Sequence, residues 1–423
     1  MVASTDIKFY VHSNNNAPQL QNAYGSMIGV LDACLVNGIS LGQVSSLTAI
    51  GTTVTAVFST AHNLLQYQVL KIAGANQSEY NGEHRILTVP NATSVTFELG
   101  STPSTTTATG TITASLPPLG WEKPFSSANA AGGGKAAYRS KNMLLPSRPF
   151  LRVVDELDPA YTATYAKFAK VGLVEDMVSI DTLIGVQAPY DALNPDKNWV
   201  GTGSGTSAIN GWAKWYYAAG SLATTISDAA TPASGSRNWV LAGNSDYFFI
   251  FPAVATGINN YSNYGFGAFN SFLSADNSNN FLSAMTRYVS AGTGGYRGEF
   301  TGLGATTSSG ATLIQRNFKQ DANHITARAY SAMVRTSSGD IYSGTANHIA
   351  DKSIANLIPF FPVFFKETTS DIVRGELPNF YWLFQDKPYT NLSIIENNGS
   401  AYIAINSFAS GSEGQVIVKI GDL

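Results

Sequence analysis

Charged residues are scarce in this chain of 423 residues, because Asp, Glu, Lys and Arg together make up only 13% of it. An ordinary globular protein carries roughly 25%. The formal net charge of −3 excludes the basic character of a nucleic-acid-binding protein and disfavours attachment to an anionic membrane surface. Neutral polar groups cost less free energy to desolvate than charges do. The low charge therefore indicates a surface that packs against other subunits.

Cysteine is nearly absent as well. Cys34 is the only one, which excludes an intramolecular disulfide and a cysteine-based metal site and favours folding in a cytoplasm. The opening residues, MVASTDIKFY, lack the basic and apolar regions of a signal peptide. The most apolar stretch, 354–365, contains two prolines and is too short to span a bilayer. We therefore expect no membrane insertion.

The motifs of common enzyme classes are missing too. The chain has no HExxH zinc motif, no G-x-S-x-G nucleophile elbow and no G-x-G-x-x-G fingerprint. The GGGK run at 132–135 lacks the spacing of a P-loop. Acidic clusters at 155–158 and 175–181 are compatible with glycoside hydrolysis or calcium binding, although solvated loops carry such clusters more often. We expect no enzyme activity, no cofactor and no metal site.

What the chain has instead is the composition of a β protein. Thr, Val, Tyr, Gly and Asn are common, aromatic residues reach 11%, and strong helix formers are scarce. We predict a mainly β fold in three parts: an N-terminal docking segment with one helix over 1–45, a small β-barrel or sandwich module over 46–117, and a large, jelly-roll-like β-sandwich domain over 118–423. Pro117-Pro118 marks the second boundary, since neither residue can donate to a strand ladder.

One amphipathic helix is predicted over 19–36. Its apolar residues recur at helical spacing, and Asn37-Gly38 supplies a left-handed stop. The apolar stripe packs either on the chain's own core or on a partner subunit. The candidate assembly residues of this stripe are Leu20, Tyr24, Met27 and Leu31.

Strand signals fill the rest of the chain. In the small module, alternation such as Val54, Ala56, Phe58 predicts strands near 52–59, 67–73, 83–89, 94–99 and 109–115. The large domain ends in a predicted hairpin of 400–408 and 415–421. Its long Gly/Ser/Asn-rich loops are expected to contact partners or carry function, and they lie at 194–211, 228–236, 256–265 and 289–311.

Aromatic residues gather at two places in the large domain. Aromatic faces beside Asn, Asp and Ser suit a sugar-binding surface, and the same residue types build strand cores and subunit interfaces. Four Phe residues lie too close together for one strand face, which favours a covered sheet or a buried oligomer interface. The candidate glycan or partner contacts are Trp199, Trp212, Trp215, Tyr216 and Tyr217, and the candidate assembly residues are Phe360, Phe361, Phe364 and Phe365.

The segment TVTAVFSTAHNLLQYQVLKIAGANQSEYNGEHRILTVPNATSVTFEL (53–99) resembles a β-module that recurs in virion proteins of tailed bacteriophages. The matching positions are His62, Gly74, Asn81-Gly82 and Val95-Thr96-Phe97. Asn63 stands where Gly is usual, and both residue types suit a left-handed backbone. Further segments are similar, in the same order, to one family of phage structural proteins, and they lie at 25–39, 120–140, 150–156, 239–251, 264–276 and 374–382.

The resemblance implies a structural component of a phage virion, assembled in the host cytoplasm. The tail is the expected place, at the baseplate, the tail tip or the fibre attachment. Such a protein acts by assembly with other virion proteins and as a homo-oligomer, with a trimer favoured, and the resemblance implies no catalytic residues. Two alternatives stay open: a tail protein that binds a host-surface glycan through 199–217, and a capsid decoration or head-fibre protein.

Overall fold

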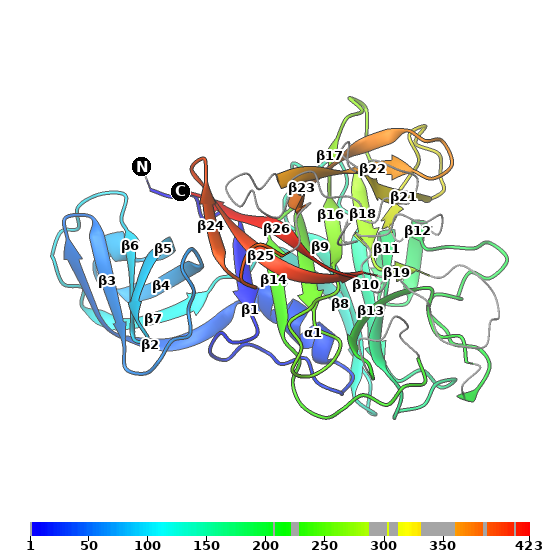
Figure 1. Ribbon diagram of the computed structural model, residues 1–423, viewed down its shortest axis with the longest axis horizontal. Coiled ribbons are helices and arrows are strands. Elements are labelled where there is room, and N and C mark those ends of the chain that lie inside the picture. Colours follow the sequence, from blue (N-terminus) through cyan, green and yellow to red (C-terminus); the bar gives the residue numbers. More distant parts are fainter. Residues whose placement is uncertain are drawn as a thin grey trace.

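The structure is a computed structural model that describes residues 2–205, 208–220, 228–286, 303, 312–330, 360–383, 387–409 and 412–423. The predicted loop at 289–311 lies outside these residues apart from Leu303. The prediction of a mainly β fold is confirmed, with 51% of residues in strands and 5% in helices. A small barrel stands beside a larger body built from two sheets (Figure 1).

The small module is a closed barrel of six strands. Five strands form where the alternation predicts them, and Val54, Ala56 and Phe58 point into the interior. The sixth, β2, begins ahead of the predicted range 46–117 and closes the barrel by pairing with both β3 and β7. A short 3-10 helix, η2 (Ser78–Tyr80), precedes β5. Around the barrel the strands are β2 (Ile39–Ile50), β3 (Thr53–Phe58), β6 (Ser94–Glu98), β5 (Gly82–Asn91), β4 (Val69–Ala75) and β7 (Gly110–Leu116).

Two antiparallel sheets form the larger body. The first has seven strands: β19 (Met285–Thr286), β13 (Ala213–Ala218), β11 (Lys167–Ser179), β10 (Phe150–Glu156), β9 (Gly133–Ser140) and β8 (Trp121–Ala128), with β12 (Thr182–Ala188) paired to β11. The second has thirteen: β1 (Lys8–Val11), β14 (Trp239–Gly243), β15 (Tyr247–Pro252), β16 (Tyr264–Ala268), β18 (Asn280–Ser283), β20 (Thr312–Ile314), β21 (Ile325–Tyr330), β22 (Phe360–Glu367), β23 (Val373–Leu383), β26 (Ser412–Asp422), β25 (Ser400–Ala409) and β24 (Ile394–Asn397), with β17 (Asn270–Ser271) paired to β23. Strands that follow one another in the chain are neighbours through most of both sheets, so the sandwich is connected mainly as a meander.

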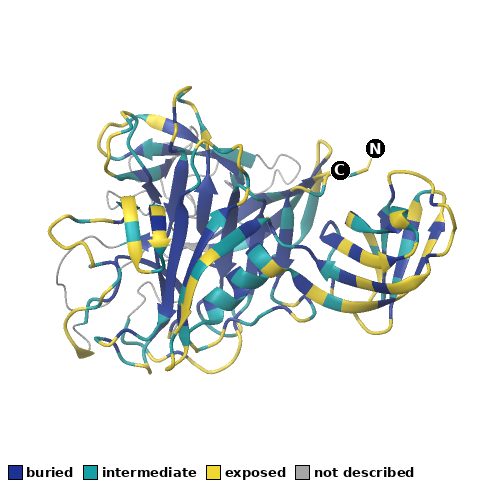
Figure 2. Cartoon of the chain, turned by 180° about the vertical axis from the view of Figure 1, so that it is seen from behind, coloured by how far each residue is buried: buried dark blue, intermediate teal, exposed yellow. Residues whose placement is uncertain are grey.

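The sheets pack in layers. Inward side chains of the seven-stranded sheet, such as Val153, join Phe248 of the thirteen-stranded sheet in one apolar cluster. The larger sheet then curls, so that its second half covers the outer side of its first half, and Phe249 lies against Phe380 with ring centroids 5.1 Å apart. The central strands are therefore buried on both faces (Figure 2), which explains their continuous apolar runs.

The N-terminal segment is built into the sandwich. Strand β1 pairs with β14 over its whole length. The helix predicted over 19–36 is shorter at its start: it comprises α1 (Ser26–Leu31) and a π-helical turn, η1 (Asp32–Asn37). Gly25 has a left-handed φ of 87° that ends the preceding irregular segment, and Leu20 forms a bridge with Arg237 instead of a helical turn. None of the helices in the described residues is long and apolar enough to cross a membrane.

This placement overturns part of the predicted assembly surface. Leu20, Met27 and Leu31 are fully buried in the chain's own core, so the prediction that they contact a partner is wrong. Their stripe faces the sheets because β1 and α1 cover the sandwich. In the second predicted cluster, Phe365 is fully buried. The residues that keep partial exposure are Tyr24, Phe360, Phe361 and Phe364.

Candidate functional site: a cleft on the outer sheet face

A cleft of about 600 Å³ opens on the outer face of the seven-stranded sheet, a volume within the usual range of small-ligand sites. Alternation along β10 aims Leu151 and Val153 into the core and leaves Arg152, Val154 and Glu156 on the outer face. The same alternation brings Lys135 of β9 and Lys170 of β11 to this face. The cleft walls come from β12 and from the loops at 157–159 and 190–200.

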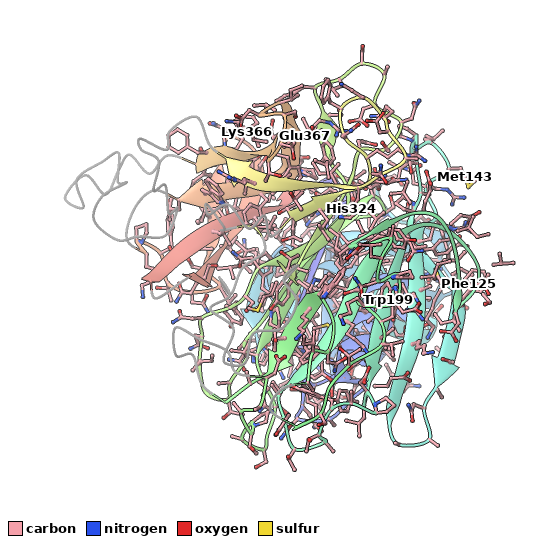
Figure 3. All side chains as sticks on the ribbon, turned by 90° about the vertical axis from the view of Figure 1, so that its right-hand side faces the viewer. Phe125, Met143, Trp199, His324, Lys366 and Glu367 are labelled. Carbon is pink, nitrogen blue, oxygen red and sulfur yellow. The ribbon has the colours of Figure 1, made fainter. Side chains whose placement is uncertain are left out.

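Trp199 lies over the sheet at one side of the cleft (Figure 3). Its neighbour Asn198 fixes the loop, because the amide donates to the carbonyl of Val171 at 2.9 Å and accepts from the main-chain N–H groups of Trp212 and Ala213. Gly172 makes room for the indole ring: a Cβ there would stand 2.5 Å from Cη2 of Trp199. The Asn198 amide thus fixes the loop, and the space left by Gly172 accommodates the indole ring of Trp199.

Arg152 contacts both Trp199 and the carboxylate of Asp181. Its guanidinium carbon lies 4.3 Å from the centre of the indole ring, a cation–π geometry. Nε donates to the carbonyl of Ile180 at 2.8 Å, and Nη2 donates to Asp181 at 2.7 Å. Lys135 reaches the same oxygen of Asp181 at 2.8 Å. Burial would raise the pKa of Asp181, but its hydrogen bonds with Lys135 and Arg152 and their charges outweigh burial and lower it.

The floor of the cleft contains a buried ion pair. Nζ of Lys170 lies 2.8 Å from Oδ2 of Asp158, and both side chains are at most 4% exposed. Asp158 also accepts the main-chain N–H of Gly201 at 2.8 Å, while Lys170 donates to the carbonyl of Trp199 at 2.6 Å. Burial lowers the pKa of Lys170, and the charge of Asp158 opposes that effect. The pair ties the loop of Trp199 to the sheet.

Several polar atoms of the cleft residues are left without partners among the described residues. Nη1 of Arg152 and Nε1 of Trp199 are buried donors with no acceptor. On the acceptor side, Asp181 is paired only through Oδ1, and Glu156 is held only through Oε2, by Asn129 at 3.2 Å. Asp196 is exposed at the rim. Because the two unpaired donors are themselves covered, a molecule in the cleft meets the free carboxylate oxygens and the partly exposed ammonium group of Lys135.

The predicted aromatic surface at 199–217 is mostly interior. Trp215, Tyr216 and Tyr217 are fully buried and Trp212 is 5% exposed, so the prediction that they stack on a glycan is wrong for these four. Strand β13 is covered on both faces, with Trp215 and Tyr217 in the sandwich core and Tyr216 under a smaller cluster that includes Phe168. Trp199 alone of the predicted five lines the cleft.

The acidic clusters also divide between interior and surface. Asp155 is fully buried and accepts hydrogen bonds from the main-chain N–H of Met27 at 3.0 Å and from the hydroxyl of Tyr217 at 2.6 Å. Glu175 pairs with Arg316 at 2.6 Å. Across the described residues, no group of three or more His, Cys, Asp or Glu side chains could hold a metal ion.

The residues that sequence reasoning missed are Lys135, Arg152, Lys170 and Gly172. Arg152 interrupts the apolar run FLRVV, and such a charge within a buried strand is a usable signal that one face of the strand is not core. The role of Gly172 could not be predicted from its neighbours in the sequence, because it depends on contact with Trp199, 27 residues further along the chain.

No protein-family model matches the chain, and comparison with curated proteins gives no match either.

Proposed function

We propose that the chain is a structural component of a tailed-bacteriophage particle, at the baseplate, tail tip or fibre attachment. It acts by oligomeric assembly with other virion proteins, after synthesis in the host cytoplasm. The ordered resemblance of its segments to phage structural proteins supports this proposal, as does a chain with about half the usual content of charged residues. Its architecture of a barrel beside a layered β body is suited to a part that makes several separate contacts.

An exposed aromatic pair supports the assembly function most directly. Phe272 is 55% exposed, and its ring centre lies 5.8 Å from that of Phe364, which is partly exposed. Aromatic residues are enriched in subunit interfaces because they bury a large apolar area. Covering this pair with another subunit gains about 25 cal/mol for each Å² of apolar surface removed from water.

The test is the mass of the purified chain in solution, measured by light scattering after size exclusion, with a search for the chain in purified phage particles by mass spectrometry. We expect a stable homo-oligomer, with a trimer favoured, and its loss in the double variant Phe272→Ser, Phe364→Ser. Met143→Ser serves as the matched control, because Met143 is also exposed, at 74%, but lies outside the pair. A chain that is monomeric at every concentration and missing from particles contradicts the proposal.

A position in the capsid, as a decoration or head-fibre protein, is the competing assignment. Gold labelling of intact particles with an antibody to the chain separates the two, because the label then falls on the tail or on the head.

A further inference from the structure

We infer that the cleft beside Trp199 binds a neutral saccharide. This inference goes beyond the assembly function and stands on the geometry of the cleft alone. Its starting point is the combination of a partly exposed indole ring, a second aromatic residue and a set of unpaired polar atoms in one cavity. Tyr190, at 40% exposure, supplies the second aromatic ring.

The aromatic residues fit the shape of a sugar ring. A pyranose presents apolar C–H groups on its faces and hydroxyl groups around its edge, so it packs on an aromatic side chain while polar groups reach its rim. Trp199 is held firmly enough for this role, since Asn198, Gly172 and Arg152 fix its loop, its edge and its ring. A preorganised ring loses little conformational freedom when a ligand packs on it.

The unpaired atoms indicate hydroxyl groups as the ligand's polar part. A hydroxyl both donates and accepts a hydrogen bond. The cleft presents acceptors, at Glu156 and at the second oxygen of Asp181, and also a donor, the partly exposed ammonium group of Lys135, which uses one of its three N–H bonds in the contact with Asp181. A purely cationic ligand would satisfy only the acceptors, and a purely anionic one only the donor. A group that can do both satisfies the whole set.

The charges in the cleft favour a neutral sugar over an acidic one. Lys135 and Arg152 already share Asp181, and Lys170 already holds Asp158. An incoming carboxylate would compete with Asp181 for both cations and would approach Glu156 and Asp196. A neutral pyranoside neither competes with Asp181 for the cations nor is repelled by Glu156 and Asp196, because its hydroxyl groups donate hydrogen bonds to carboxylates.

The site can be tested through tryptophan fluorescence. The chain has six Trp residues, all of them described, and five are at most 5% exposed. Trp199 is therefore the residue whose emission a ligand in the cleft changes most. The probes are methyl α-glucoside, methyl α-galactoside, methyl α-mannoside and chitobiose as neutral sugars, with glucuronic acid and N-acetylneuraminic acid as acidic ones.

We expect at least one neutral probe to give a saturable change in emission, and saturation-transfer NMR to show its ring protons in contact with the protein. Trp199→Leu removes the reporting indole, so its binding is followed by saturation-transfer NMR, and we expect it to be weaker by at least about tenfold, in line with the loss of one aromatic contact. Gly172→Ala weakens it too, because the added methyl displaces the indole ring. Met143→Ser leaves binding unchanged, and circular dichroism checks that each variant is folded.

The variant Asp181→Asn tests whether the charge of this carboxylate makes the cleft prefer neutral over acidic sugars. Removing this carboxylate's charge frees Lys135 and Arg152, so the variant should gain affinity for glucuronic acid by about tenfold relative to the parent chain. The inference is overturned if no neutral probe binds the parent chain at the limit of solubility, or if the acidic probes bind it more tightly than the neutral ones. Since binding is measured on the purified chain, these outcomes are independent of whether it assembles into particles.

Discussion

The guanidinium of Arg85, in barrel strand β5, donates a 2.8 Å hydrogen bond to the main-chain oxygen of Ile420 in the last strand, β26. It also donates to the carbonyl groups of Ser4, Ile7 and Tyr67. One buried side chain thus joins the barrel to both ends of the chain, which lie close together in Figure 1. Gly421 permits this approach, because a side chain at that position would overlap the guanidinium.

Arg85→Met is expected to lower the free energy of unfolding by about 3 kcal/mol, since four carbonyl groups lose a charged donor in a buried place. Urea denaturation measures the change. The matched control is Arg139→Met, whose ion pair with Glu122 is about a quarter to a third exposed and is worth at most about 1 kcal/mol. Equal losses in the two variants would contradict a joining role for Arg85.

Asp155 predicts a pH dependence of stability with a definite sign. Burial raises its pKa from an ordinary value of 3.8 to about 6, against the opposing hydrogen bonds from Tyr217 and α1. The folded chain therefore binds more protons than the unfolded chain between these values, and the contribution of Asp155 to stability falls as the pH rises through that window. Above about pH 6 the contribution is constant.

The variant Asp155→Asn isolates this effect, because the amide does not titrate. Its melting temperature should rise relative to that of the parent chain as the pH is raised from 4 to 6.5, and the difference should then level off. Thermal unfolding followed by circular dichroism at half-unit steps provides the measurement. A difference in melting temperature between the two chains that is the same at every pH would contradict the raised pKa of Asp155.

Gly172→Ala is expected to move Trp199 without straining the backbone. The new methyl would meet the indole edge at 2.5 Å, so the ring must swing outward, and acrylamide should quench a larger fraction of the tryptophan emission. Gly29→Ala is the control: Gly29 lies in α1 with open space around its Cα, and the substitution should stabilise the helix by about 1 kcal/mol with no change in quenching. Unchanged quenching in Gly172→Ala would mean that the glycine does not hold the ring in place.

Arg374 stands in a buried network with two carboxylates. It donates to Glu367 at 2.7 Å and to Asp276 at 2.6 Å, and all three side chains are at most 1% exposed. Arg374→Met should cost about 3–5 kcal/mol of stability, because it leaves two carboxylates buried without a countercharge. Lys366, beside Glu367 in Figure 3, pairs with the exposed Asp371, so Lys366→Met should cost at most about 1 kcal/mol in the same urea experiment.

The small barrel was predictable because one face of each strand is exposed to solvent and the other is buried, which produces an alternating sequence pattern. Val54, Ala56 and Phe58 alternate with Thr55 and Val57, and the observed burial follows the same period. The strand β2 escaped prediction because polar residues and Gly42 weaken its pattern. The helix start was misplaced for a local reason, since Leu20 and Tyr24 have helical spacing while Gly25 adopts a left-handed backbone.

The cleft was only partly predictable. Trp199 was found from composition, because it lies in a polar, aromatic segment. Its position beside Arg152 depends on the pairing of β10 with β11 and on the loop that returns over Gly172, which no local pattern encodes. For the buried residues of β13 the sequence left a strand core, a subunit interface and a glycan contact open, because nothing within AKWYYA tells that both faces are covered.

The pairing of β1 with β14 has a consequence for the order of folding. The barrel strands are contiguous in the chain, from Ile39 to Leu116, so the barrel can close as soon as that stretch has been synthesised. Strand β1 has no partner until β14 is made, and at the usual rates of translation that delay is on the order of 10 to 50 seconds. Strand β1 therefore leaves the ribosome well before the strand that it pairs with, and until β14 arrives its edge is open to a chaperone or to another nascent copy.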